Sequence, residues 1–177
     1  MTLKIETDRL ILRELALTDA SGMYLLDADP EVHRYLGNKP ITSMEQAQDN
    51  ILFIQTQYEK AGSGRWAVED KISGQFMGWG GLKFITDVVN DHQYFYEVGY
   101  RLIPAFWGKG YATEIAVASI HYGFKVLGLT EIFAMTDVAN LASQRVLEKA
   151  GMQKTEQYIH NLNGQLIDCY WFRIGTY

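Results

Sequence analysis

Hydrophobic and polar residues alternate with two periods along this chain, and each period predicts one kind of element. Apolar residues recur every three or four positions from Met44 to Tyr58, which is typical of one buried helical face. Similar spacing predicts helices over 111–127 and 141–150, and a short helix around Met23. Strands are predicted over 9–13, 66–69, 76–85, 92–102, 131–136, 153–159 and 166–174.

Residues typical of element ends support these assignments. The segment Ser43-Met44-Glu45-Gln46 fits a capping box, and Asn140 is placed to cap the helix that follows it. The segment Asp29-Pro30-Glu31 predicts another helix, with the Asp as N-cap and the Pro at the first helical position. The dipeptide Asn163-Gly164 predicts a tight hairpin between the last two strands.

The order of the elements predicts the fold class. One strand, two or three helices and three strands are followed by helix, strand, helix and two strands. This order is that of a mixed α/β domain with a mostly antiparallel sheet, in which the strand-helix-strand unit around 111–127 adds a parallel crossover. It matches neither a doubly wound nucleotide-binding fold nor a barrel. We expect residues 1–177 to form a single domain.

Composition narrows the function classes. The 177 residues are 47% hydrophobic and 21% charged, which excludes wholesale disorder. The single cysteine, Cys169, excludes a disulfide framework and a cysteine-rich zinc site, and no other metal-ligand spacing is present. The net charge of -5 argues against nucleic-acid binding through bulk charge. Charged residues interrupt the apolar stretch 111–129, so we expect a cytoplasmic protein without a membrane span.

The segment Trp107-Gly108-Lys109-Gly110-Tyr111-Ala112 carries the strongest chemical signal. Its glycines let successive backbone N–H groups converge immediately before a helix N-terminus, which makes a cradle suited to a pyrophosphate. A plain tight turn is the alternative. The segment fits neither the P-loop nor the dinucleotide fingerprint.

Four segments resemble one known family in the same order along the chain: ETDRLILREL, DPEVHRYLG, EVGYRLIPAFWGKGYATE and NLASQRVLEKAGM. The chain resembles the GNAT superfamily of acetyl-CoA-dependent N-acetyltransferases, most closely its ribosomal-protein N-terminal acetyltransferase (RimJ/RimL-like) branch. The resemblance covers nearly the whole chain. It implies a GNAT-like sheet with helices on both faces, acetyl-CoA as co-substrate and no metal.

The resemblance also implies roles for single residues. The backbone around Tyr100 and Leu102 would pair with the pantetheine arm of CoA, and Asn140 would hydrogen-bond the cofactor near that arm. Lys109 and Arg145 are candidates for the outer phosphates. The pyrophosphate would lie on the backbone of Trp107, Gly108, Lys109, Gly110, Tyr111 and Ala112.

The chain departs from the family pattern at two positions. Trp107 replaces the usual Gln or Arg at the start of the loop, which leaves a cradle built from backbone intact. Many members place a Tyr seven residues after the Asn, as the acid that protonates the leaving thiolate, and here that position is Leu147. Ser143 is the hydroxyl that the resembling branch offers for this role. It could equally satisfy only the first helical turn.

Amine acetylation needs a base, because an ammonium ion has no lone pair with which to attack a thioester. Glu97 is the first candidate, beside the expected acetyl site, and a strand carboxylate paired with Lys or Arg is the alternative. His160 is the second candidate, and a surface histidine is its alternative. Cys169 has no histidine near it in sequence and is not expected to form an acyl-enzyme.

The predicted function is acetyl transfer to a primary amine, either a protein N-terminus or a small amine, by direct attack in a ternary complex. The net charge mildly favours a cationic acceptor. A non-catalytic acyl-CoA sensor or scaffold is the alternative, and an unrelated phosphate-binding domain is a third reading. We expect no nucleic-acid or membrane partner, and a homodimer by analogy with small domains of the family.

Overall fold

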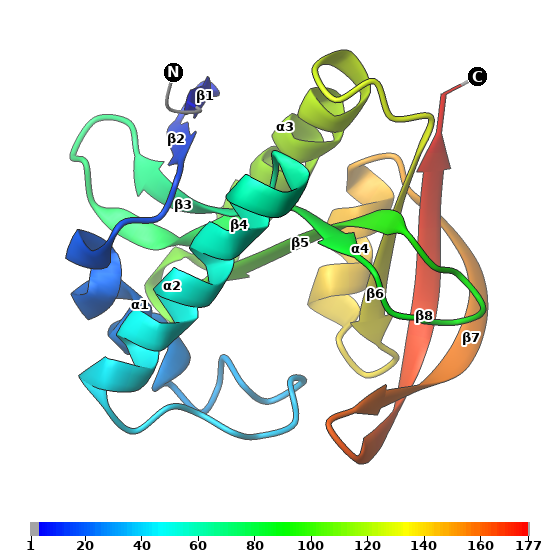
Figure 1. Ribbon diagram of the computed structural model, residues 1–177, viewed down its shortest axis with the longest axis horizontal. Helices are drawn as coiled ribbons and strands as arrows, with labels where there is room; N and C mark the ends of the chain where they lie inside the picture. The colour runs from blue at the N-terminus through cyan, green and yellow to red at the C-terminus, as the bar shows by residue number, and fades with distance from the viewer. Residues whose placement is uncertain (1–3, 177) are drawn as a thin grey trace.

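The computed structural model describes residues 4–176, which contain a mixed eight-stranded sheet with helices on both faces (Figure 1). The strands follow the spatial order β1-β2-β3-β4-β5-β6-β8-β7. They are β1 (Lys4–Glu6), β2 (Leu10–Arg13), β3 (Arg65–Asp70), β4 (Phe76–Ile85), β5 (Phe95–Leu102), β6 (Glu131–Asp137), β7 (Gln153–Leu162) and β8 (Gln165–Gly175). The four α-helices are α1 (Ala20–Asp27), α2 (Met44–Ala61), α3 (Tyr111–Lys125) and α4 (Leu141–Lys149).

The strand directions confirm the predicted fold class. All neighbouring strands run antiparallel except β5 and β6, which run parallel and are joined through α3. A parallel neighbour needs a crossover connection, and the 28 residues from 103 to 130 supply one with a helix inside it. This single parallel step is the feature that positions the candidate site.

The helices cover opposite faces of the sheet. Ala67 of β3 and Trp79 of β4 pack with the apolar residues of α1 and α2. Leu82 and Val98 point to the other face, where they pack against Ala116 of α3 and residues of α4. Because side chains alternate along a strand, the two faces of β4 and β5 can carry different chemistry. Within residues 4–176, no helix has the length and apolar composition needed to cross a bilayer.

The structure confirms three of the predicted element ends. The Ser43 hydroxyl accepts from the Gln46 N–H and the Gln46 side chain accepts from the Ser43 N–H, which completes the capping box of α2. Asn140 caps α4 through its side-chain oxygen. Asn163 and Gly164 have φ of 51° and 90°, the two positive values of a type I′ hairpin turn.

The helix predicted to begin at Asp29 is wrong. The Asp29 carboxylate accepts from the N–H of Glu31, and the chain then forms successive turns from residue 30 to 37. The His33 N–H bonds the Pro30 carbonyl three residues back, so no α-helical turn develops. Positive φ at Gly37 and Asn38 then reverses the chain. Strand β1 was not predicted, because three residues are too few to show a period.

Candidate active site

The gap between β5 and β6 is the centre of the candidate site. These strands pair at only one position, Glu97 with Phe133, and then diverge. On its other side β5 stays bonded to β4, where the Ile103 N–H donates to the Met77 carbonyl at 2.9 Å. Because N–H and C=O groups alternate between the two edges of a strand, the backbone of Tyr100 and Leu102 faces the gap. The structure therefore brings both predicted pantetheine-binding residues to a strand edge with which no other strand pairs, where the Leu102 carbonyl accepts from the Trp107 indole.

The loop after β5 carries a run of backbone donors without partners among the described residues. A short 3₁₀ helix, Pro104–Phe106, leads to Gly108 and Gly110, whose φ values are 71° and 81°. Among the residues described, none accepts a hydrogen bond from the N–H of Gly108, Lys109 or Gly110. A Cβ at Gly108 would meet nothing within 4 Å, so no atom of the described residues fills the space beside it. These donors precede the N-terminus of α3, and the arrangement fits a pyrophosphate.

Side chains hold this loop in shape. The Trp107 indole Nε1 donates to the Leu102 carbonyl at 2.7 Å, which ties the loop to β5. The Lys109 ammonium donates to the Ala105 carbonyl at 2.9 Å and stays exposed, so its charge lies beside the cradle. Arg9 donates from Nη1 to the Lys109 carbonyl at 2.9 Å. Trp107, which stands where the family pattern has Gln or Arg, thus has a structural role in this loop.

Arg9 is a loop-positioning residue that the sequence analysis missed. Its Nε donates to Glu114 at 2.7 Å, and its guanidinium lies 4.3 Å from the centroid of the Tyr111 ring. Burial raises the pKa of Glu114, but hydrogen bonds from Thr7 and Arg9 outweigh it and leave that pKa below its usual value. Local sequence carries no signal for this contact, because about a hundred residues separate its partners.

The start of α4 lies across the gap from β5. The Asn140 side-chain oxygen accepts from the Ser143 N–H at 3.1 Å, which leaves the amide NH₂ group free. The Ser143 hydroxyl lies 3.0 Å from the Tyr100 hydroxyl, which also donates to the Ser143 carbonyl. Burial raises the pKa of Tyr100. Arg145 is exposed on the same helix. The structure therefore groups Tyr100, Asn140 and Ser143, while Arg145 stays outside this hydrogen-bonded group.

Glu97 is paired with a buried arginine. The Arg65 Nη2 lies 3.0 Å from the Glu97 carboxylate, and Arg65 Nη1 donates to the carbonyls of Gly81 and Glu97. Arg65 is 7% exposed, and burial lowers its pKa against the opposing charge of Glu97. A Cβ at Gly99 would lie 2.6 Å from Nη2, so only glycine leaves room for the guanidinium. Glu97 is therefore a strand carboxylate paired with an arginine, which the sequence left open as the alternative to a catalytic base.

His160 is a half-buried imidazole within the electrostatic influence of Glu97. Burial lowers the pKa of His160, and the Glu97 charge opposes this shift only in part. The ring is therefore mostly neutral near pH 7, as a proton acceptor must be. The neighbouring Tyr158 ring lies 6.0 Å away and donates its hydroxyl to the Met135 sulfur.

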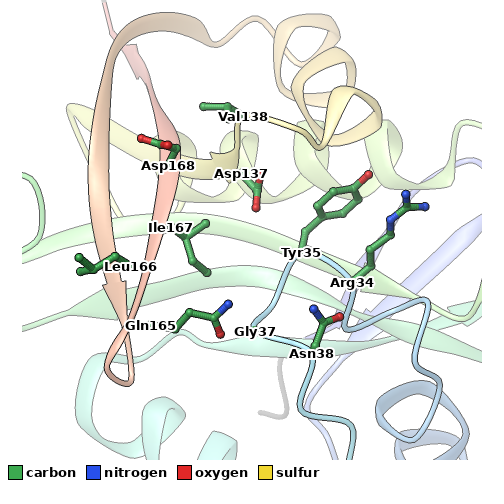
Figure 2. Close-up of a pocket in the computed structure, with 10 residues that line it drawn as sticks. All are labelled: Arg34, Tyr35, Gly37, Asn38, Asp137, Val138, Gln165, Leu166, Ile167 and Asp168. Atoms are coloured by element: carbon green, nitrogen blue, oxygen red, sulfur yellow. The ribbon is translucent and has the colours of Figure 1, made fainter.

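A cavity of about 300 Å³ lies between the turn segment after α1, the C-terminal end of β6 and the β7–β8 hairpin (Figure 2). The Asp137 carboxylate points into it, facing Tyr35 and Ile167 (Figure 2). One Asp137 oxygen accepts from the Ala139 N–H at 2.7 Å, and the other has no hydrogen-bond partner among the described residues. Its place in the cavity depends on β6 and β8 meeting, which the local sequence did not indicate.

Two further observations bear on covalent and on metal-assisted catalysis. Cys169 is buried in β8, and burial raises the pKa of its thiol to about 12, so it is not a thiolate near neutral pH. Residues 4–176 contain no group of three His, Cys, Asp or Glu side chains that could hold a metal ion.

Comparisons with known proteins identify the family of this chain. The acetyltransferase (GNAT) domain model matches residues 9–153. The uncharacterized N-acetyltransferase YoaA of Bacillus subtilis is 35% identical over 167 residues, which cover 93% of this chain and 92% of YoaA. The FsC-acetyl coenzyme A-N(2)-transacetylase of Aspergillus fumigatus is 31% identical, over 90% of this chain and 71% of the relative.

Solved structures show the same fold. A GNAT-family acetyltransferase from Bacillus anthracis superposes with a TM-score of 0.80 at 24% identity, covering 98% of each chain. The spermidine N-acetyltransferase of Vibrio cholerae, solved in complex with CoA and spermine, superposes with a TM-score of 0.75 at 20% identity, covering 96% of each chain. The family model and the sequence relatives together place this chain in the GNAT family of acetyl-CoA-dependent N-acetyltransferases.

Proposed function

We propose that this chain transfers the acetyl group of acetyl-CoA to a primary amine that enters from the cavity beside Asp137. The observation that carries the proposal is the open edge of β5, between the donor cradle before α3 and that cavity. The acceptor is a protein N-terminus or a small amine, and attack is direct within a ternary complex. We further propose that residues 1–177 act as one acyltransferase domain in the cytoplasm, possessing the features of the RimJ/RimL-like branch.

CoA would be held mainly by backbone. The free N–H groups of Gly108, Lys109 and Gly110, with those of Tyr111 and Ala112 at the helix start, would bind the pyrophosphate. The open edge at Tyr100 and Leu102 would pair with the pantetheine arm as an added strand does. The free amide of Asn140 would donate to the same arm. Lys109 and Arg145 are the cations proposed for the outer phosphates.

Two groups are candidates to take the proton from the amine. Glu97 lies where β5 and β6 separate, but Arg65 occupies one face of its carboxylate. His160 has no such partner among the described residues, and its lowered pKa keeps it neutral near pH 7. If His160 is the base, the rate falls as the pH drops through the imidazole pKa, which lies below 6.5, and the His160→Gln variant loses this pH dependence.

Ser143 is the proposed donor of a proton to the departing thiolate. Its hydroxyl is oriented by the Tyr100 hydroxyl at 3.0 Å, and it lies at the start of α4 beside the gap. Because a thiolate is a good leaving group at neutral pH, we expect Ser143→Ala to lower kcat only modestly, by about tenfold or less.

The relatives support an amine acceptor in general terms. One is named for N(2)-transacetylation of FsC, and a structural neighbour was solved with spermine. A homodimer is proposed by analogy with the family alone. The competing proposal is a binding module that holds acyl-CoA without turnover.

Thermal unfolding with acetyl-CoA, CoA and ATP tests cofactor binding. A ligand at about 100 times its dissociation constant adds about 2.7 kcal/mol of stability. We expect a shift with acetyl-CoA and CoA but not ATP, and no shift for Gly108→Glu. Gly128→Glu is the matched control, because Gly128 also has positive φ with nothing within 4 Å but lies beyond the other end of α3.

Thiol release with a panel of amines then tests turnover. Release above the hydrolytic background with any amine excludes the binding module. A shift with acetyl-CoA but no release with any amine or peptide would favour the binding module instead. The absence of any shift would contradict the cradle assignment.

A further inference from the structure

A second cavity, of about 280 Å³, adjoins the first and shares Gly37 and Gln165 with it. Three side chains with basic nitrogens line it: His33, Lys39 and Arg101. No carboxylate is among its lining residues, whereas Asp137 and Asp168 line the first cavity. The two adjoining cavities therefore differ in the charge that they present to a ligand.

Arg101 is held rigidly at this cavity. Its Nη1 donates to the Asp27 carboxylate at 2.7 Å, and Asp27 is only 2% exposed. The guanidinium lies 4.8 Å from the centroid of the Trp79 ring, which supports it from one side. A guanidinium has five N–H donors, and Asp27 is the only partner of Arg101 among the described residues. The remaining donors are available to an acidic group.

His33 has an unsatisfied polar atom at the same place. The residue is 7% exposed, and its Nε2 is buried without a hydrogen-bond partner in the part of the chain described. The nearest opposite charge, the Asp27 carboxylate, lies 3.9 Å away, beyond hydrogen-bonding distance. A buried polar group without a partner is costly and rare, so a rotation of the imidazole that let Nε2 reach a ligand in the cavity would be favourable.

Lys39 supplies the net charge of this cavity. Asp27 and Arg101 neutralise each other, and no ion pair within residues 4–176 involves Lys39. Lys39 is exposed at the rim of the cavity, where it can meet an incoming ligand. The cavity is thus positively charged overall, although the chain as a whole is negative.

The separation of Glu97, a proposed base, and Arg101 limits the size of the acceptor. Arg101 lies four residues after Glu97 on the same face of β5, about 13 Å along the strand at about 3.3 Å per residue. An α-amino acid is too short to place its amine beside Glu97 and its carboxylate at Arg101. Two extended peptide residues span about 7 Å, and the side chains of Arg101 and of a glutamate at the third residue would together bridge the remainder.

We propose that this second cavity binds an acidic group of the acceptor, and that the acceptor is a peptide N-terminus with a carboxylate or phosphate at about its third residue. The inference rests on the proposed acetyl transfer and deepens it. Arg101 and Lys39 would bind the acidic group, and His33 Nε2 would join them after the imidazole rotates toward the ligand. The acetylated amine would lie at the gap between β5 and β6.

Peptides with amidated C-termini test the proposal. We would compare Ser-Ala-Glu-Ala with the same peptide carrying Gln, Lys or phosphoserine at its third residue. We expect kcat/KM for the Glu peptide to exceed that for the Gln peptide by about tenfold or more, since a hydrogen bond to a charged group is lost. A larger gain with phosphoserine than with Glu would identify phosphate as the acidic group. Equal rates for all four peptides would overturn the inference and leave acetyl transfer standing.

Variants test whether the second cavity is the origin of the preference for an acidic third residue. Lys39→Gln should lower the Glu-to-Gln ratio, while the exposed Lys60→Gln, at the far end of α2, should leave it unchanged. Arg101→Gln alone leaves Asp27 buried and unpaired, so the double variant Asp27→Asn/Arg101→Gln keeps the site neutral. An unchanged ratio in both Lys39→Gln and the double variant would overturn the assignment of the cavity. If no peptide or amine is acetylated although acetyl-CoA binds, the proposed function fails and the inference fails with it.

Discussion

Gly99 lies directly beneath the Arg65 guanidinium, and replacing it with alanine adds one methyl group at the centre of the Arg65–Glu97 pair. The new Cβ would lie 2.6 Å from Nη2, 2.7 Å from Cζ and 2.9 Å from Nη1 of Arg65. The guanidinium cannot simply swing away, because it is buried and donates to Gly81, to the Glu97 carbonyl and to the Glu97 carboxylate.

The cost follows from these contacts. A shift large enough to relieve the clash lengthens at least one charge-assisted hydrogen bond, each worth about 1.5–3 kcal/mol. Complete separation of the pair would cost about 3–5 kcal/mol, because each charge would stay buried without its partner. We therefore expect Gly99→Ala to lose about 3 kcal/mol of unfolding free energy. With a urea m-value of about 2 kcal/mol per M, the midpoint falls by about 1.5 M.

Urea unfolding followed by circular dichroism measures this loss. Gly175→Ala is the matched control, since Gly175 also lies in a strand, has no positive φ, and places its nearest neighbour at 3.4 Å. It should change stability by less than about 0.5 kcal/mol. In an Arg65→Met background the cost of Gly99→Ala should shrink sharply. Equal midpoints for Gly99→Ala and Gly175→Ala would refute the reasoning.

Three further predictions concern single residues. Asn140→Ala should cost about 1 kcal/mol by removing the cap of α4, whereas Asn140→Asp keeps the cap, so weaker CoA binding in the Asp variant assigns the amide to the cofactor. Burial and then the Arg101 charge lower the pKa of His33, so the unfolded chain binds a proton first and stability falls as the pH drops below about 6.5. His33→Gln should flatten this fall in urea titrations between pH 7 and 5, and an unchanged slope would contradict it. Trp107→Phe removes the bond to the Leu102 carbonyl and should weaken acetyl-CoA binding more than it lowers stability, as calorimetry and unfolding would measure.

Short-range sequence signals predicted the ends of elements correctly where the backbone hydrogen bonds close within a few residues. The capping box at Ser43 and the Asn163-Gly164 turn each close hydrogen bonds within four residues, so sequence alone specifies them. The helix start predicted at Asp29 is wrong, although Asp before Pro is typical of a helix N-terminus. An aspartate before a proline also begins turns, and no apolar period after Pro30 favoured helix over turn.

Sequence likewise predicted some parts of the candidate site and missed others. The glycines of the loop before α3 are visible in sequence, because a cradle of backbone donors needs their conformational freedom within a few residues. The partners of its charged groups are not visible. Arg65 reaches Glu97 across 32 residues, and Arg9 reaches the Lys109 carbonyl across 100. Charge alone does not select such partners, since any of 16 basic residues could pair with any of 21 acidic ones.

By itself the sequence determined the mixed α/β class and the position of the loop before α3, and it predicted the kind of ligand that such a loop can hold. These depend on periodicity and on backbone geometry over a few residues. Only the tertiary structure decided that Glu97 is paired, that Asp137 faces a cavity, and that His33 and Arg101 share another. Those facts depend on which strands lie side by side and which side chains burial forces together, and both are properties of the whole packed chain.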